Sequence, residues 1–278
     1  MTGKTSRRRY DLLIVHPDTN LTPTHVATLQ AAGITVLCYL TVGEDDTLHT
    51  AAASDGRSGP ADGYASWYYD ADQNGRPDQN PDWGSYYTNA SDPAWRAALR
   101  SYRNSGDQHW YGTDYLLNTL HCDGLFLDTI GTVRPAAWGG RYSAGLGAML
   151  DLIAELRTQL GPNRLLVINR GLFYFDPYDA AANPNGLQEI TPAMRDRLRG
   201  LINGLLYEEF MQEEHRDQWA ARLNAEAQQP DGFTVFALDY LPRDAASTCA
   251  TERALGWLPH LSTPALDTFT HVVREECP

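Results

Sequence analysis

The chain has 278 residues, of which 42% are hydrophobic and 21% charged, the proportions of a globular protein with a substantial core. Acidic residues outnumber Lys and Arg by 35 to 22, so the formal net charge is −13. This balance argues against a nucleic-acid-binding protein, which usually has a basic surface. It suits a cationic substrate, or an acidic surface that serves only solubility. No stretch approaches the ~20 apolar residues that a membrane span needs, so we expect none.

The first residues are basic and polar, and we expect residues 1–10 to form an N-terminal tail. A single domain is then expected over residues 11–278, because one domain can reach this length. The apolar segment Leu12–Val15 is too short for the core of a signal peptide, so no signal peptide is visible.

The chain contains four cysteines and no C-x-x-C pair, so a thiolate zinc site is not expected. Cys38 and Cys122 lie in or beside apolar segments and are predicted to be small core residues. Cys249 and Cys277 are candidates for a disulfide that sequence alone does not establish.

Short apolar or β-rich segments recur along the chain, with helix signals between them. Most are continuously apolar, as in strands buried on both faces of a parallel sheet. The eight predicted strands are Leu12–Val15, Thr35–Leu40, Ser85–Thr88, Gly124–Leu127, Leu165–Ile168, Gly204–Tyr207, Phe233–Leu238 and Trp257–His260.

Four pairs of a capping residue and a proline predict helix starts, at Thr22, Asp92, Thr191 and Thr263. The clearest amphipathic helix spans residues 146–160. Strands that alternate with helices predict an α/β fold, a single (β/α)8 TIM barrel with a long aromatic-rich loop after the second strand. An open doubly wound sheet is the main alternative, although no G-x-G-x-x-G follows the first strand.

The long loop covers residues 44–84, far beyond the ~2 to 6 residues of an ordinary βα loop. Its aromatic residues either stack on sugar rings or pack the loop onto the barrel, and the sequence leaves both open. They are Tyr64, Trp67, Tyr68, Tyr69 and Trp83.

Part of this loop fits the opening of a calcium site, with Asp70, Asp72, Asn74 and, at the ninth position, Asp78. The twelfth position, where a bidentate glutamate belongs, is Pro81. The missing ligand favours an Asx-rich turn, with calcium as the alternative. We expect no required cofactor.

Barrel enzymes carry catalytic groups at the carboxyl ends of their strands. Acids occupy that position at Glu44, Asp128, Glu208 and Asp239. One such acid alone would indicate a helix cap or a partner for Arg170. Several together favour a site, and two carboxyl groups are the minimum for cleaving a glycosidic bond.

Five segments of the chain carry a resemblance to a known family. The segments are CYLTVGE at 38–44, DWGSYYTNASDPAWR at 82–96, CDGLFLD at 122–128, LVINRG at 166–171 and INGLLYEEF at 202–210. Together they resemble the endo-α-1,4-polygalactosaminidases, glycoside hydrolase family 114, in which they occur in the same order, and they span most of the expected barrel.

The resemblance implies a secreted barrel, extracellular or periplasmic, that cleaves α-1,4-linked galactosamine polymers within the chain. It places the catalytic acids at Asp128 and Glu208. Family members usually follow that glutamate with a small residue, whereas this chain has Glu209. By analogy Asp128 is the nucleophile and Glu208 the acid/base of a retaining mechanism.

The remaining residues at the strand ends would line the sugar site of a monomer that binds a cationic polysaccharide and no nucleic acid. They are Tyr39, Glu44, Trp83, Asn169, Arg170, Asp239 and Tyr240, with His16 and Asp18 as further candidates after the first strand. Two alternatives stay open: a non-catalytic carbohydrate-binding barrel, and a hydrolase of a different aminoglycan. An interruption at residues 104–107 and the aromatic pair after it leave the substrate's identity open.

Overall fold

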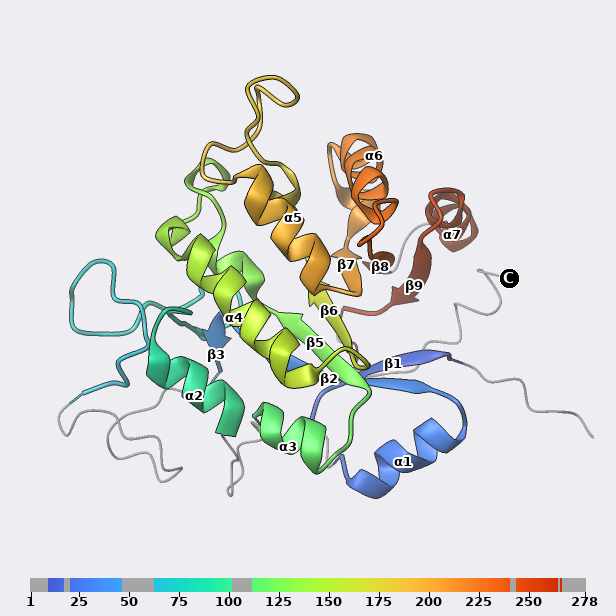
Figure 1. Cartoon of the computed structure of the whole chain (residues 1–278), viewed down its shortest axis with the longest axis horizontal. Coiled ribbons are helices and arrows are strands. Elements are labelled where there is room, and N and C mark those ends of the chain that lie inside the picture. Colours follow the sequence, from blue (N-terminus) through green and yellow to red (C-terminus); the bar gives the residue numbers. More distant parts are fainter. Residues whose placement is uncertain are drawn as a thin grey trace, which may run out of the picture. The chain divides into compact units, whose positions relative to one another are not determined.

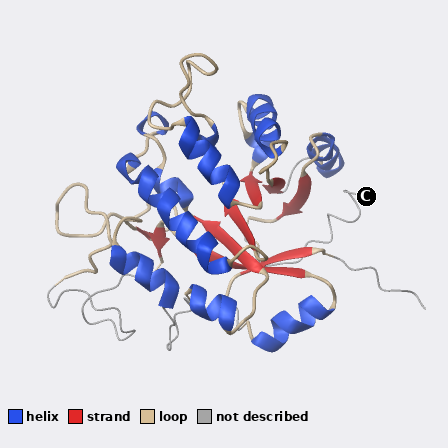
Figure 2. Ribbon diagram, viewed as in Figure 1, coloured by secondary structure: helices blue, strands red, loops and turns tan. Residues whose placement is uncertain are grey.

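The computed structural model describes residues 10–17, 21–46, 63–101, 112–240, 244–264 and 266. Helices alternate with parallel strands, which confirms the predicted α/β class (Figures 1 and 2). The chain forms two compact units. The first comprises Met1–Val133 and Ala144–Leu165, and the second Arg134–Ser143 and Leu166–Pro278.

The first unit contains a parallel sheet in the order β1-β2-β5. The register places Thr41 of β2 opposite Asp128 of β5. The elements of this unit are β1 (Leu12–Val15), α1 (Pro23–Ala31), β2 (Thr35–Thr41), β3 (Glu44–Asp45), β4 (Tyr86–Tyr87), α2 (Pro93–Ser101), α3 (Thr113–Asn118), β5 (Gly124–Asp128), the 3-10 helix η1 (Ile130–Val133) and α4 (Leu146–Leu160).

The second unit contains parallel strands in the order β6-β7-β8-β9. Figure 1 shows α7 beside β9, the strand on which it packs. The elements are η2 (Ala136–Trp138), β6 (Leu165–Asn169), η4 (Leu172–Phe175), α5 (Pro192–Leu201), β7 (Gly204–Glu208), η5 (Phe210–Gln212), α6 (Arg216–Ala227), β8 (Thr234–Tyr240), α7 (Ala245–Ala254) and β9 (Leu258–Ser262). The short η3 (Ser143–Gly145) leads into α4.

Seven of the eight predicted strands are parallel strands, and the third is not. The segment predicted at 85–88 forms β4, which pairs antiparallel with β3. Tyr86 and Tyr87 are only half-buried, whereas a parallel strand is usually covered on both faces. The described residues therefore contain seven parallel strands, and the expected third barrel strand was wrong.

Three predicted helix starts are confirmed by the hydrogen bonds of their caps. The side chain of Thr22 accepts from the His25 amide at 3.2 Å, and that of Thr191 accepts from the Met194 amide at 3.2 Å. Asp92 accepts from the Ala94 amide at 2.7 Å in the same way. The helix expected after Thr263 falls largely outside the described residues.

Two glycines, one after β2 and one at the start of β5, allow close backbone approaches. A Cβ on Gly43 would lie 2.2 Å from the carbonyl oxygen of Thr129, and one on Gly124 would lie 2.2 Å from that of Leu165. Any larger residue would push these backbones apart. Gly43 therefore fixes how the chain leaves β2 beside the end of β5.

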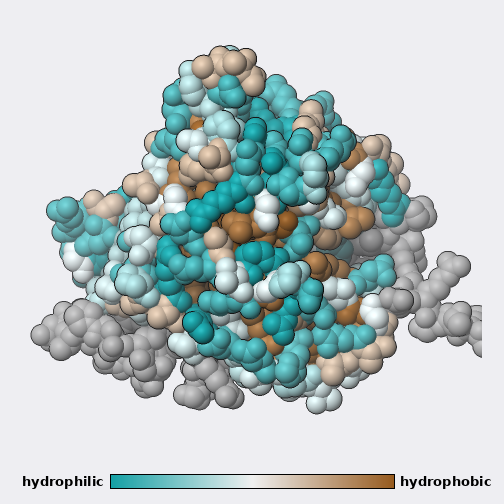
Figure 3. Space-filling view, in the orientation of Figure 1, coloured by the Kyte–Doolittle hydropathy of each residue, from teal (hydrophilic) through white to brown (hydrophobic). Residues whose placement is uncertain are grey.

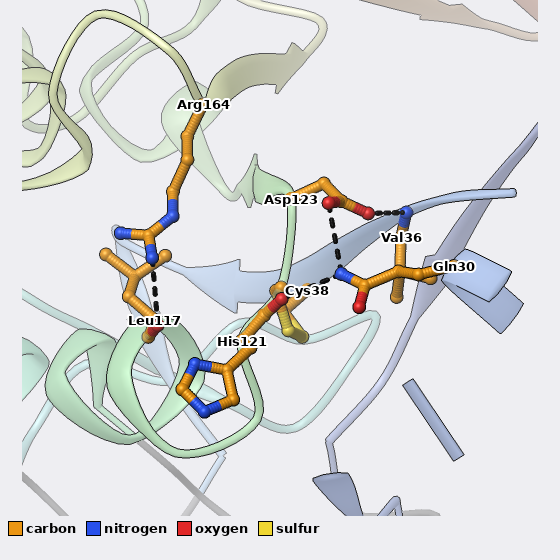
Figure 4. The surroundings of a disulfide bond; sticks show 8 residues. Gln30, Val36, Cys38, Leu117, His121, Asp123 and Arg164 are labelled. Carbon is orange, nitrogen blue, oxygen red and sulfur yellow. Dashed lines mark hydrogen bonds between the residues drawn. A yellow bond between two sulfur atoms is a disulfide. The ribbon is translucent and has the colours of Figure 1, made fainter. Parts of the chain in front are cut away.

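Cys38 and Cys122 are core residues, as predicted, and they also form a disulfide that the sequence did not predict (Figure 4). Both are buried, and their Cα atoms lie 6.0 Å apart, a normal spacing for a disulfide. Beside the bond, Asp123 accepts from the Val36 amide at 2.8 Å and from the Gln30 side chain at 3.0 Å. This bond thus joins β2 to the segment that enters β5.

Cys249 on α7 is also disulfide-bonded, while its predicted partner Cys277 lies outside the described residues. Disulfides persist mainly in oxidising compartments. The oxidised cysteines therefore agree with an extracellular or periplasmic location.

Hydrophilic residues predominate on the face drawn in Figure 3, with apolar residues in smaller patches among them. None of the helices in the described part of the chain is long and apolar enough to cross a bilayer.

Candidate active site

The carboxylate of Asp128, at the end of β5, is fixed by donors on both oxygens. The Tyr39 hydroxyl on β2 donates to Oδ2 at 2.7 Å, and the Thr129 amide donates to Oδ1 at 2.7 Å. Burial first, and then the charge of Asp128, raise the pKa of the Tyr39 phenol. The phenol therefore keeps its proton and remains a donor to Asp128.

The residue after Asp128 is clamped in an unusual conformation. Thr129 has φ = 62°, in the left-handed region that residues with a branched Cβ rarely adopt. Its hydroxyl oxygen accepts from the amides of Val42 at 3.1 Å and Gly43 at 2.8 Å, and lies 2.7 Å from the Thr41 hydroxyl. These contacts hold the turn that directs Asp128.

The surroundings of Tyr39 are acidic. Asp128, Asp46 and Glu44 each add to the negative potential that raises the Tyr39 pKa. Glu44 is buried and accepts from the Asn80 side chain at 3.0 Å and from the Ser85 hydroxyl. Burial raises the pKa of Glu44. Its hydrogen bonds from Asn80 and Ser85 hold the long loop near Tyr39 and Asp128.

The other candidates of the first unit have different positions. The ring of His16 stacks on Tyr39 with centroids 4.6 Å apart, whereas Asp18 lies outside the described residues. Trp83 is 83% exposed, on the loop whose Asn80 binds Glu44. The structure thus brings His16, Tyr39, Glu44 and Asp128 together and leaves Trp83 projecting into solvent.

The candidate calcium loop binds its own backbone. Asp70 accepts from the amides of Asn74 at 3.0 Å and Gly75 at 2.9 Å, while Asp78 accepts from Ala71 at 2.7 Å. These bonds are those of an Asx-rich turn. A search of the described ranges finds no group of three or more His, Cys, Asp or Glu residues placed to hold a metal.

In the second unit, the carboxylate of Glu208 at the end of β7 contacts three polar side chains. The Tyr240 hydroxyl donates to Oε1, and the side-chain amide of Asn169 donates to Oε2 at 3.1 Å. Arg170 Nε lies 3.4 Å from Oε2, and the Glu208 side chain is 21% exposed. Burial and the bond to Glu208 raise the pKa of Tyr240, which therefore stays protonated.

Glu209 has a more open environment than its neighbour. Its side chain is 41% exposed, and its carboxylate contacts Arg170 at 3.3 Å and accepts from the side-chain amide of Gln212 at 3.2 Å. Its backbone is left-handed, with φ = 60°, and its N–H donates to Leu238 O at 2.7 Å. Burial and the number of fixed donors favour Glu208 as the functional glutamate.

Asp239 does not share the surroundings of Tyr240, because adjacent strand residues point to opposite faces. It is 2% exposed, and its Oδ1 accepts from the Met211 amide at 3.1 Å. A side chain so enclosed has little surface to offer a sugar, although the sequence predicted Asp239 at the sugar site. Its burial and its bond to the turn after β7 favour a supporting role instead.

Three strand ends share a build that sequence analysis missed. Each of β5, β6 and β7 ends in a polar residue, and the next residue is a non-glycine with positive φ. The pairs are Asp128 with Thr129 (62°), Asn169 with Arg170 (55°) and Glu208 with Glu209 (60°). Strained backbone of this kind concentrates at functional sites. The polar residues were visible in the sequence, but the backbone conformation was not.

No family model and no curated protein sequence matches the chain. Among solved structures, it is similar to the glycoside hydrolase domain of PelA from Pseudomonas aeruginosa, at 25% identity over 94% of this chain and 90% of that one, with a TM-score of 0.62. A single-residue variant of that domain gives 24% identity, 93% and 89% coverage and a TM-score of 0.61. A GH18 chitinase from Pseudoalteromonas aurantia shares the fold alone, at 13% identity over 96% of this chain and 90% of that one, with a TM-score of 0.51.

Proposed function

We propose that this protein is a glycoside hydrolase in which Asp128 and Glu208 are the catalytic carboxyl groups. The supporting observation is the matched build of the two strand ends. Each carboxylate closes a parallel strand, accepts from a tyrosine hydroxyl on the adjacent strand and precedes a left-handed residue. The similarity to the PelA glycoside hydrolase domain supports the same reaction class.

Two carboxyl groups suffice for a retaining hydrolysis. Asp128 attacks the anomeric carbon while Glu208 gives its proton to the leaving glycosidic oxygen, so that one C–O bond forms as another breaks. Glu208 then takes a proton from water, which attacks the same carbon and releases Asp128. These roles come from the family resemblance, and the fixed donors on both oxygens of Asp128 suit a residue that must stay ionised and oriented.

The substrate we propose is an α-1,4-linked galactosamine polymer, cleaved within the chain. Support comes from the resemblance and from the acidic surroundings of Tyr39, where Asp128, Asp46 and Glu44 gather. Ammonium groups of deacetylated amino sugars are attracted to such a potential, and the net charge of −13 adds to it. The oxidised cysteines support a secreted enzyme.

The test measures new reducing ends after incubation with partly deacetylated galactosaminogalactan, with chitosan and an uncharged glucan in parallel. We expect release from the first polymer, and none after Asp128→Asn or Glu208→Gln. Asp217→Asn is the matched control, because that side chain is 97% exposed. Release only from chitosan would overturn the substrate, and binding without release from any polymer would overturn the enzyme.

The roles of the two acids are tested separately. Azide added to Asp128→Gly should restore cleavage of an activated glycoside and give a glycosyl azide of inverted configuration, because azide occupies the place of the nucleophile. In Glu208→Ala, azide should instead give a product of retained configuration. The reverse pattern would exchange the two roles.

A further inference from the structure

Two carboxyl groups face each other in the interior of the second unit. Asp239 on β8 is 2% exposed and Glu252 on α7 is 0% exposed. The Glu252 carboxyl lies within hydrogen-bonding reach of that of Asp239, yet as carboxylates neither Oδ2 of Asp239 nor either oxygen of Glu252 has a donor. Because ionised carboxylates only accept hydrogen bonds, one of the two must carry a proton to make this contact.

The surroundings place that proton on Glu252. Burial first, and the neighbouring Asp239 second, raise the pKa of Glu252 from 4.5 to about 9. Asp239 Oδ1 already accepts from the backbone amide of Met211. At neutral pH, Glu252 is therefore the donor and Asp239 the acceptor.

Asp239 lies at the centre of the contacts that hold the turn after β7. Three consecutive residues of β8 bind that turn: Leu238 O accepts from the Glu209 amide at 2.7 Å, Asp239 accepts from Met211 at 3.1 Å and the Tyr240 hydroxyl donates to Glu208. Glu252 on α7 interacts with Asp239, the second of these three residues. Movement of Asp239 would therefore disturb the turn that carries Glu208.

We propose that Glu252 is a positioning residue for Glu208, acting through Asp239, and that loss of the Glu252 proton loosens the turn at residues 208–211. Two buried anions would then repel each other where a hydrogen bond had been. The effect on catalysis rests on the proposed hydrolase function. The effect on the turn does not.

Other titratable or charged groups lie on the elements around the pair. Those whose pKa is shifted differ from Glu252 in keeping one charge state over the pH range of interest. Burial lowers the pKa of His260 from 6.5 and raises that of Tyr207, so both stay neutral between pH 6.5 and 9. Arg253 is exposed. The groups on or beside these elements are Tyr207 on β7, Glu213 after η5, Tyr240 on β8, Asp244 at the N-cap of α7, Arg253 on α7 and His260 on β9, with Arg170 acting on Tyr207.

The sign of the pH effect follows from proton linkage. Above pH 4.5 the unfolded chain has released the Glu252 proton, while the folded protein keeps it until about pH 9. The contribution to stability is full below pH 4.5 and is lost as pH rises to about 9. In that window, this one proton raises the unfolding equilibrium constant by about tenfold per pH unit.

The experiment follows urea unfolding and hydrolysis from pH 6.5 to 9.5 in the wild type, Glu252→Gln and the exposed control Glu214→Gln. Glutamine donates to Asp239 at every pH, so Glu252→Gln should lose the tenfold dependence and keep activity at higher pH. The control should follow the wild type. Identical pH profiles in the wild type and Glu252→Gln would overturn the proposal.

A measurement on the wild type stands beside the variants in case Glu252→Gln does not fold. Hydrogen exchange of the Met211 amide, expressed as a protection factor, should fall at least tenfold between pH 7 and 9.5 while amides in α4 keep theirs. Unchanged protection would overturn the proposal. If no polymer is cleaved, the proposed function fails, and the exchange and unfolding results still decide the role of Glu252.

Discussion

Tyr240, the last residue of β8, donates its hydroxyl hydrogen to Glu208, the last residue of β7. Register explains the contact, because Glu208 lies opposite Leu238, two residues before Tyr240. Tyr39 donates to Asp128 with the opposite offset, because it comes two residues before Thr41, which lies opposite the aspartate. Both phenols are kept protonated by burial, so each carboxylate has a permanent neutral donor.

Removing the donor on Glu208 tests its importance. We expect Tyr240→Phe to lower kcat by 10- to 100-fold with little change in KM. The Tyr240 hydroxyl stabilises the carboxylate that Glu208 becomes once it has given up its proton, and a hydrogen bond to a charged group contributes ~1.5–3 kcal/mol. Steady-state kinetics would measure this, with far-UV circular dichroism to check folding. Tyr178→Phe removes a hydroxyl elsewhere in the same unit and should leave kcat unchanged. A kcat in Tyr240→Phe within twofold of wild type would contradict a role for this contact.

The corresponding change in the first unit tests whether Asp128 belongs to the same reaction. Tyr39→Phe keeps the ring that stacks on His16 and removes only the donor to Asp128. We expect a loss in kcat of similar size, about 10- to 100-fold, because Asp128 loses the side-chain donor on its Oδ2. Normal turnover in this variant, alongside a defect in Tyr240→Phe, would remove Asp128 from the mechanism.

Replacing each of the two adjacent glutamates in turn tests which of them is catalytic. Glu208→Gln should abolish turnover, whereas Glu209→Gln should cost less than about tenfold, because Glu209 is exposed and its contacts with Arg170 and Gln212 are surface interactions. Reducing-end assays on both variants would show the difference. The opposite ranking would move the assignment by one residue.

Sequence reasoning predicted most of the α/β fold because the signals were local. Continuous apolar segments marked the parallel strands, and Thr22 and Thr191 marked helix starts by their own side-chain chemistry. The segment at 85–88 was misassigned because its tyrosines have high β-propensity in either kind of sheet. Its pairing with Glu44–Asp45, across the long loop, is a tertiary event that no local pattern specifies.

The same limit applies to the candidate site. Residue types at the strand ends were visible, so Tyr39, Asp128, Glu208 and Tyr240 were all named in advance. Asp239 was grouped with Tyr240, although adjacent strand residues point to opposite faces. Which of the two faces is enclosed depends on helix α7 later in the chain, where Glu252 lies beside Asp239. The disulfide was missed for a similar reason, since Cys38 and Cys122 are 84 residues apart and meet only when β2 pairs with β5.

Exposed Trp83 provides a test of polymer binding apart from chemistry. We expect Trp83→Ala to weaken binding of a long polymer by about 5- to 20-fold, because stacking on one aromatic face contributes ~1–2 kcal/mol. Affinity electrophoresis and the melting temperature would measure binding and folding separately. The side chain is 83% exposed, so stability should not change. Unchanged polymer affinity would mean that Trp83 is not a sugar platform.

The disulfide joins the two strands that carry the Tyr39–Asp128 contact, since Cys38 precedes Tyr39 on β2 and Cys122 precedes β5. Cys38→Ala combined with Cys122→Ala should lower the free energy of unfolding by about 2–4 kcal/mol, because the closed loop is long and its entropy in the unfolded chain is restored. Urea unfolding of this double variant and of the wild type, each with and without reductant, would measure the loss. Reductant should destabilise the wild type by more than the double variant, which keeps only the disulfide of Cys249.

The activity of the folded double variant tests a second role of the disulfide. If kcat stays normal, the disulfide contributes stability alone. If kcat falls as in Tyr39→Phe, the disulfide also holds β2 and β5 in the register that Asp128 needs. An unfolding free energy equal to that of the wild type would show that pairing of β2 with β5 does not depend on the covalent link.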